Sequence, residues 1–319
     1  MRRVSSRLKP LHACIAVAAF ALAAFLVHRA MQEYTWSEVL ASLRQISLGH
    51  LALGGLFTAG SFVCLTGSEA LAVRYTGRTL PYPKIALASF TSLSIGHTLG
   101  FAIFSSGAIR YRFYVGWGLS AGDVARIIVF CGVTIAVGLA TVGGLAALIR
   151  PDLVAETFGF APAAIVALGV VLLLAVAIYL ALAAFVHRPI RIRSFELPVP
   201  PLRLALAQIA VASTDLLLVS AVLHQMFAAT SDIAFLPVAA AYVTANTAGI
   251  ISHVPGGLGV IEAILLFLVP GANAVGALVA FRAIYFLIPF FIGGLVLGVS
   301  EIVRRNRRKL QDSRPSRPI

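Results

Sequence analysis

Long apolar stretches dominate this chain and decide what it can fold into. A helix needs about 20 apolar residues to cross the hydrocarbon core of a bilayer. Charged residues make up only 12% of the chain, whereas soluble globular domains typically carry about 25%. So few charges could not cover the surface of a water-soluble fold, and disordered chains are polar. The sequence therefore predicts an all-α, polytopic integral membrane protein. Its candidate membrane segments are 11–29, 49–73, 85–106, 121–149, 162–187, 202–228, 236–252, 260–270 and 273–301.

The first candidate segment resembles a secretory signal peptide but departs from that pattern. Residues 1–10 are basic and residues 11–27 are apolar. The apolar stretch is longer than usual for a signal peptide, and no A-x-A cleavage site precedes Met31. We interpret it as an uncleaved membrane span. Residues 35–46 then place apolar side chains at helical spacing, which predicts a short interfacial helix anchored by Trp36.

Basic side chains gather in five clusters, and their positions predict the topology. The net charge of +13 would suggest nucleic-acid binding in a soluble protein. In membrane proteins, however, basic residues collect in cytoplasmic loops, so we expect no nucleic-acid partner and five cytoplasmic clusters. Both termini are then cytoplasmic: segments 1–10 and 304–319 flank a single transmembrane domain, 11–303. The clusters are Arg2, Arg3, Arg7 and Lys9; Arg74, Arg78 and Lys84; Arg110 and Arg112; Arg188, Arg191, Arg193 and Arg203; and the seven Lys and Arg residues after 303.

Two segments do not fit as full crossings under this topology. If 11–29, 49–73, 121–149, 162–187, 202–228 and 273–301 make six full crossings, residues 85–106 and 236–270 must each return to their own side. The first contains SIGHTLG and FSSGA, and the second contains HVPGGLG. Broken backbone at membrane depth is tolerated only where protein or a wet cavity surrounds it. We therefore predict two re-entrant broken-helix hairpins, one from each face, as in many secondary transporters.

Ionisable side chains inside the second half of the chain are the first candidate site residues. Glu262 directly follows the HVPGGLG break, where a carboxylate favours the exposed N–H groups of a helix start. Arg282 lies too deep in the last span to reach water and needs a partner, for which Glu262, Asp215 or a ligand phosphate are candidates. Asp215 lies mid-span on a polar helix face with Gln208. Each residue also has a purely structural alternative. Glu262 could only cap its helix, Arg282 could form a structural ion pair, and Asp215 could hydrogen-bond between helices.

The stretch FSSGAIRYRFY supplies a second group of candidates. Arg110 and Arg112 with flanking aromatics form either a phosphate-gripping site or a plain interfacial belt. Arg126 could extend this positive group, while Asp123 is expected to cap its own helix. We expect Glu69 to pair with nearby Arg74 at the surface.

No motif of an enzyme or a metal site is present. The chain lacks a nucleophile elbow, a Walker loop, HExxH and GxGxxG, and its three cysteines lie singly in apolar runs. We therefore expect no enzymatic activity, no metal and no cofactor.

Three motifs together resemble a known family. SSGAIRYRFYVGWGLS (105–120), HVPGGLGVIEAILL (253–266) and ALVAFRAIYFLIP (277–289) resemble the transmembrane flippase domain family of lysylphosphatidylglycerol synthases, and look closer still to its stand-alone bacterial inner-membrane members. The resemblance covers roughly 10–305 and implies movement of anionic or aminoacylated phospholipid, such as phosphatidylglycerol or cardiolipin. The motif positions are Arg110, Arg112, Gly256, Gly257, Glu262 and Arg282. The full-length synthases add a soluble aminoacyl-transferase domain, which this sequence lacks, so we expect no aminoacyl-lipid synthesis.

These observations converge on a multi-pass phospholipid translocator of the bacterial inner membrane, with membrane phospholipids as partners and homo-oligomer formation left open. Arg110, Arg112, Arg126 and Arg282 would hold the headgroup phosphate, and Glu262 and Asp215 would balance them. One alternative is an ion-coupled transporter of a small anion, whose cavity would open to water. The other is a non-transporting scaffold, in which the buried charges pair only with each other.

Overall fold

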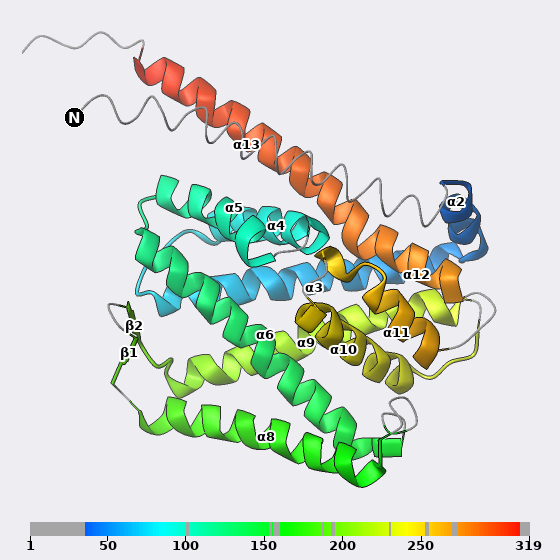
Figure 1. Ribbon diagram of the computed structural model, residues 1–319. Helices are drawn as coiled ribbons and strands as arrows, with labels where there is room; N and C mark the ends of the chain where they lie inside the picture. Colours follow the sequence, from blue (N-terminus) through cyan, green and yellow to red (C-terminus); the bar gives the residue numbers. More distant parts are fainter. Residues whose placement is uncertain are drawn as a thin grey trace, which may run out of the picture.

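The computed structural model describes residues 36–99, 102–152, 155, 160–186, 188–192, 195–229, 231–252, 255–269 and 274–312. Helices form almost all of this part, as composition predicts (Figure 1). The longer helices are α3 (Leu48–Tyr75), α4 (Tyr82–Leu99), α5 (Ala102–Gly116), α6 (Ala121–Ile149), α8 (Pro162–Phe185), α9 (Leu202–Ala228), α10 (Phe235–Ser252) and α13 (Ile288–Asp312). The shorter elements are α2 (Trp36–Gln45), η1 (Pro255–Gly257), α11 (Val260–Leu268), α12 (Ala274–Arg282), η2 (Ala283–Leu287) and two three-residue strands, β1 (Ile190–Ile192) and β2 (Phe195–Leu197).

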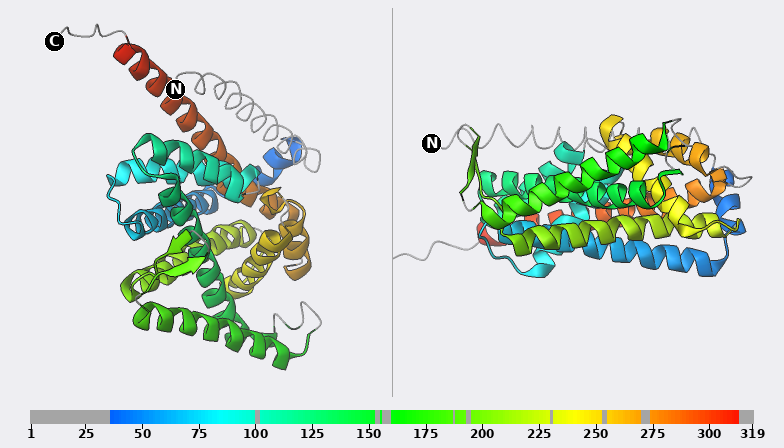
Figure 2. Two further views of the ribbon diagram at one scale, coloured as in Figure 1. Left: turned by 60° about the vertical axis from the view of Figure 1, so that its left-hand side comes forward. Right: turned by 90° about the horizontal axis from the view of Figure 1, so that it is seen from below.

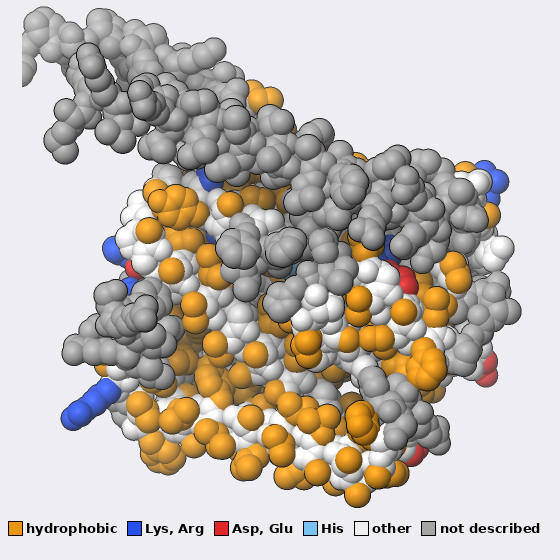
Figure 3. Space-filling model, in the orientation of Figure 1, with side chains coloured by type: hydrophobic (Ala, Val, Ile, Leu, Met, Phe, Trp, Pro, Cys, Tyr) orange, Lys and Arg blue, Asp and Glu red, His pale blue; other side chains and the backbone are white. Residues whose placement is uncertain are grey.

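Six helices of the described residues are long and apolar enough to cross a membrane. Five of them are spans that the sequence predicts: α3, α6, α8, α9 and the helix that runs on through α13. The sixth is α10, which the topology argument assigns to a re-entrant hairpin. The expected span 11–29 lies outside the described residues. The protein is thus a multi-pass membrane protein, and apolar side chains cover the face that α8 contributes (Figure 3).

The two expected hairpins are present. Helix α4 packs against α5, and α10 packs against α11 through the turn η1. Figure 1 shows the α4–α5 hairpin at the left-hand end of the bundle and the α10–α11 hairpin at the right-hand end, with their tips directed toward each other. Helix α4 also contacts η1, so the tips meet. The second hairpin turns at Pro255–Gly257, inside the predicted HVPGGLG. The first hairpin is longer than the predicted 85–106, because α5 continues to Gly116, and FSSGA lies within α5 instead of breaking it.

Small residues let the central helices pack closely. Helices α3 and α9 run side by side through the middle of the bundle, and α6 crosses them obliquely (Figures 1 and 2). A Cβ built on Gly138 of α6 would lie 2.5 Å from the Cβ of Ala212 of α9. A Cβ on Gly144 would lie 3.2 Å from the backbone oxygen of Gly169 in α8. Such close approach of small residues is how membrane helices gain packing energy.

The last span is one continuous helix with a π turn inside it. Helix α12 ends at Arg282, η2 is a single π turn over Ala283–Leu287, and α13 continues from Ile288. A π turn contains one residue more than an α turn and often marks a functional position. The end of α13 extends beyond the bundle (Figure 1).

Candidate functional site

Arg282 is the centre of the polar contacts at the tip of the second hairpin. Its Nε donates to Glu262 Oε1 at 2.5 Å, and the pair is nearly buried, with side chains 12% and 8% exposed. Its Nη1 donates to the Gly256 carbonyl at 2.7 Å and its Nη2 to the Gly257 carbonyl at 3.3 Å. The other oxygen of Glu262 accepts from the Gly259 N–H at 2.9 Å, which caps α11. The guanidinium therefore holds the broken backbone in shape.

The glycines of this break have two separate reasons to be glycine. Gly256, Gly257 and Gly259 all have positive φ, between 61° and 78°, where a Cβ is strained. Gly256 also faces the tip of the first hairpin: a Cβ there would lie 3.1 Å from the Thr98 carbonyl oxygen. The four predicted residues Gly256, Gly257, Glu262 and Arg282 thus form one cluster at the junction of the two hairpins.

A second, fully buried ion pair joins the first hairpin to α3. Arg110 Nη2 donates to Glu69 Oε2 at 2.7 Å and its Nε lies 2.8 Å from Oε1, with the two side chains 4% and 0% exposed. Ser106 accepts from Nη1 at 3.0 Å, and the buried Tyr114 hydroxyl donates to Glu69 at 3.0 Å. The expected Glu69–Arg74 pair is wrong, because Glu69 points inward to Arg110. Arg110 is held by this carboxylate rather than presented to a ligand.

The remaining predicted arginines lie apart from both clusters. Arg112 pairs with Glu301 of α13, which Arg304 also approaches at 3.5 Å. Arg126 approaches Asp123 at 3.5 Å. Asp123 caps α6 together with Ser120, as the sequence predicts.

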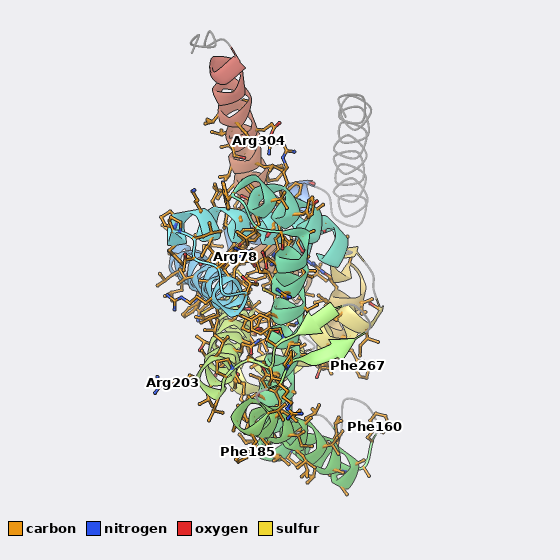
Figure 4. The ribbon with its side chains drawn as sticks, turned by 90° about the vertical axis from the view of Figure 1, so that its left-hand side faces the viewer. Arg78, Phe160, Phe185, Arg203, Phe267 and Arg304 are labelled. Atoms are coloured by element: carbon orange, nitrogen blue, oxygen red, sulfur yellow. The ribbon has the colours of Figure 1, made fainter. Side chains whose placement is uncertain are left out.

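Asp123 also binds Arg78 at 3.2 Å. Three of the basic residues, Arg78, Arg203 and Arg304, are labelled in Figure 4, which looks onto the end of the bundle that is on the left in Figure 1.

Asp215 forms a third group, separate from Arg282. It lies at the midpoint of α9 and accepts a hydrogen bond from the Ser61 hydroxyl of α3 at 2.5 Å. The same hydroxyl lies 3.1 Å from the Tyr285 hydroxyl in the π turn. Gln208, two turns earlier, bonds instead to Thr134 of α6 and Tyr179 of α8. The polar face of α9 therefore serves two different contacts.

A surface cavity of about 400 Å³, open to the outside, lies where the end of α3 meets the start of α9. Arg74 and Arg203 line it together with Tyr75, whose hydroxyl donates to the Pro198 carbonyl at 2.5 Å. The other walls are apolar, from Leu71, Val199, Pro201, Leu204 and Ala207. Within the described part of the chain, neither Arg74 nor Arg203 makes an ion pair or a side-chain hydrogen bond.

Sequence reasoning did not find this cavity. Its two arginines belong to different basic clusters, each of which reads as an ordinary cytoplasmic loop. The one available signal was that Arg74 and Arg203 directly adjoin long apolar stretches; in the structure Arg74 lies in the last turn of α3 and Arg203 in the first turn of α9.

Comparison with known proteins supports the membrane assignment. No protein-family model matches the chain. The chain is 27% identical over 268 residues to the inner membrane protein YbhN of Escherichia coli, covering 82% of this chain and 83% of that protein. It is 33% identical over 305 residues to the uncharacterized protein slr0712 of Synechocystis, covering 94% of this chain and 95% of that protein. At that identity and coverage, the chain belongs to the same protein family as the Synechocystis protein.

Proposed function

We propose that the protein moves phospholipids with anionic or aminoacylated headgroups, such as phosphatidylglycerol or cardiolipin, across a bacterial inner membrane. The inner-membrane location is inferred from the name of the Escherichia coli relative. The substrate class follows the resemblance of 105–120, 253–266 and 277–289 to the transmembrane flippase domain of lysylphosphatidylglycerol synthases. The proposed movement involves no covalent chemistry.

The cavity at Arg74 and Arg203 carries this proposal. Apolar walls beside two cationic side chains suit an amphiphile, because acyl chains can contact the walls while the phosphate meets guanidinium groups. A small water-soluble anion would gain nothing from the apolar walls. The scaffold alternative predicts buried charges that pair with each other, whereas Arg74 and Arg203 are exposed beside the cavity and form no ion pair within the described residues, so a headgroup can reach them.

The junction of the two hairpins supports the proposal because it offers the headgroup a polar path across the membrane. Two broken hairpins that enter from opposite ends and touch at Gly256 and Thr98 leave the bilayer interrupted by polar protein. A headgroup that leaves the cavity needs such a polar route. In this account Arg110 and Arg282 shape the route, each through its own carboxylate, and the headgroup first binds at Arg74 and Arg203.

The test is leaflet-resolved flipping in proteoliposomes with fluorescent phosphatidylglycerol and phosphatidylcholine. We expect the wild type to flip phosphatidylglycerol faster than phosphatidylcholine, and Arg74→Gln/Arg203→Gln to lose that preference. Arg150→Gln is the matched control, because it removes one exposed arginine that pairs with Asp152 away from the cavity. Equal flipping of both lipids by wild type and the double variant would refute the proposal.

A further inference from the structure

Asp215 is an acidic side chain in the middle of a membrane-spanning helix, with hydroxyl neighbours instead of a cation. Its hydrogen-bond donor is Ser61, at 2.5 Å, and Tyr285 continues the chain of hydroxyls at 3.1 Å from Ser61. Within the described residues no Lys, Arg or His nitrogen lies within 4.0 Å of its carboxylate. This distinguishes Asp215 from Glu69 and Glu262, which each have an arginine.

Arg282 does not act as the cation that pairs with Asp215. Each of its three guanidinium nitrogens donates within the hairpin tip: Nε to Glu262, Nη1 to Gly256 and Nη2 to Gly257. Turning toward Asp215 would leave Glu262 as a buried charge without a partner, which is strongly unfavourable. The guanidinium therefore stays with the hairpin.

The groups that face Asp215 from the other helices include no basic side chain apart from Arg282, which is held at the hairpin tip. They are Cys64 of α3, Tyr242 of α10 and Tyr285 of the π turn. Helix α6 packs on α9 through Gly138 and has no ionisable residue from Thr134 to Ile149. Helix α8 contributes Tyr179, which binds Gln208 instead.

A buried hydroxyl without a partner lies on the same face of α3 as Ser61, where α3 meets α9 and the π turn; this contact region is called the seam. Gly54, Thr58 and Ser61 lie at helical spacing on one face of α3, and this face meets α9 and the π turn at both ends. Thr58, between them, is 7% exposed, and its Oγ1 makes no hydrogen bond. Buried polar atoms are rarely left without a partner. The seam therefore has spare capacity to rearrange hydrogen bonds when its charge state changes.

We propose that Asp215 is a proton-binding site, which is protonated in this conformation and releases its proton when the surrounding helices move. An ionised carboxylate among hydroxyl and apolar groups is costly, and a proton removes the charge without any other ligand. The inference that this proton drives lipid movement rests on the proposed function. The proton site itself does not.

Carbodiimide labelling tests the site without any transport assay. Dicyclohexylcarbodiimide modifies protonated carboxyl groups in apolar surroundings, and peptide mass spectrometry locates the adduct. In the purified full chain we expect labelling at Asp215 that falls as the pH is raised, and no labelling at Glu69 or Glu262, each of which forms an ion pair with an arginine. The exposed Asp232 is a further unlabelled control. No adduct at Asp215, or protection by sodium at constant pH, would overturn the proton site.

Asp215→Asn tests the coupling. The asparagine side chain resembles the protonated acid and can still accept from Ser61, so the variant is expected to fold. A pH gradient across the proteoliposome should accelerate flipping by the wild type, and Asp215→Asn should lose this acceleration. If labelling is positive but the wild type flips no lipid, the proposed function fails and the proton site stands. Acceleration that persists in Asp215→Asn would refute the coupling.

Discussion

Gly256 and Thr98 belong to different hairpins and lie so close that a Cβ on Gly256 would be 3.1 Å from the Thr98 carbonyl oxygen. This contact joins the tips of two segments that enter the bundle from opposite ends. Gly256 also has a second partner, because Arg282 of the last span donates to its carbonyl oxygen. The backbone of one residue thus meets both the first hairpin and the last span.

The first prediction separates the hairpin contact from backbone strain. Gly256→Ala adds a Cβ at φ 61° and also against Thr98, whereas Gly259→Ala adds one at φ 78° with nothing within 4 Å. Positive φ costs an alanine about 1–2 kcal/mol at either position. We expect Gly256→Ala to lower the thermal unfolding temperature in detergent clearly more than Gly259→Ala. Equal shifts would show that the tips are not in tight contact.

The second prediction tests how closely α13 packs on α4. A Cβ on Gly293 would collide with the Ser94 side chain, while a Cβ on its neighbour Gly294 would meet nothing within 4 Å. Gly293→Ala should destabilise the protein by about 1–3 kcal/mol through overpacking. Gly294→Ala should be neutral or stabilise the helix by up to about 1 kcal/mol. Chemical unfolding in mixed micelles measures both, and a tolerated Gly293→Ala would contradict the packing.

The third prediction concerns the buried pair of Glu69 and Arg110. Glu69→Ala leaves the Arg110 charge buried with no carboxylate, which should cost about 3–5 kcal/mol. Tyr114→Phe removes a single hydrogen bond to the carboxylate and should cost about 1.5–3 kcal/mol. Folded yield and thermal unfolding report both changes. If Glu69→Ala were no worse than Tyr114→Phe, the pair would not be buried as described.

The fourth prediction is the orientation in the membrane. Thr79 follows α3 at the arginine-rich end, and Asp232 lies between α9 and α10. In a background without the three native cysteines, a membrane-impermeant thiol reagent applied from the periplasm should label Asp232→Cys and spare Thr79→Cys, because basic loops stay cytoplasmic. The reverse pattern would invert the topology.

Much of the fold could be predicted because the bilayer imposes it. Apolar length alone predicted α3, α6, α8 and α9, and glycine and proline predicted the break of the second hairpin, whereas FSSGA of the first hairpin proved to be helical. The cluster of Glu262 and Arg282 was also accessible, since a deep arginine needs a partner and only a few carboxylates lie deep enough.

The pairing of Glu69 could not be predicted from the sequence. Local spacing favours Arg74, and only the tertiary packing of α5 on α4 and α6, which both contact α3, brings Arg110 to it. The cavity could not be predicted from the sequence for the same reason, because Arg74 and Arg203 become neighbours only when α3 and α9 lie side by side. Sequence shows which side chains are costly to bury, whereas their partners depend on tertiary contacts.

The π turn over Ala283–Leu287 sets the phase of the last span. One extra residue offsets the helix after it by about 100° relative to the helix before it. A single rod can therefore present one stripe to α2 and α9 and a different stripe to α4. Deleting one residue here would restore a regular α-helix and bring the wrong side chains of α12 or α13 to their neighbours. The extra residue thus sets the rotation of α13 about its axis relative to α12.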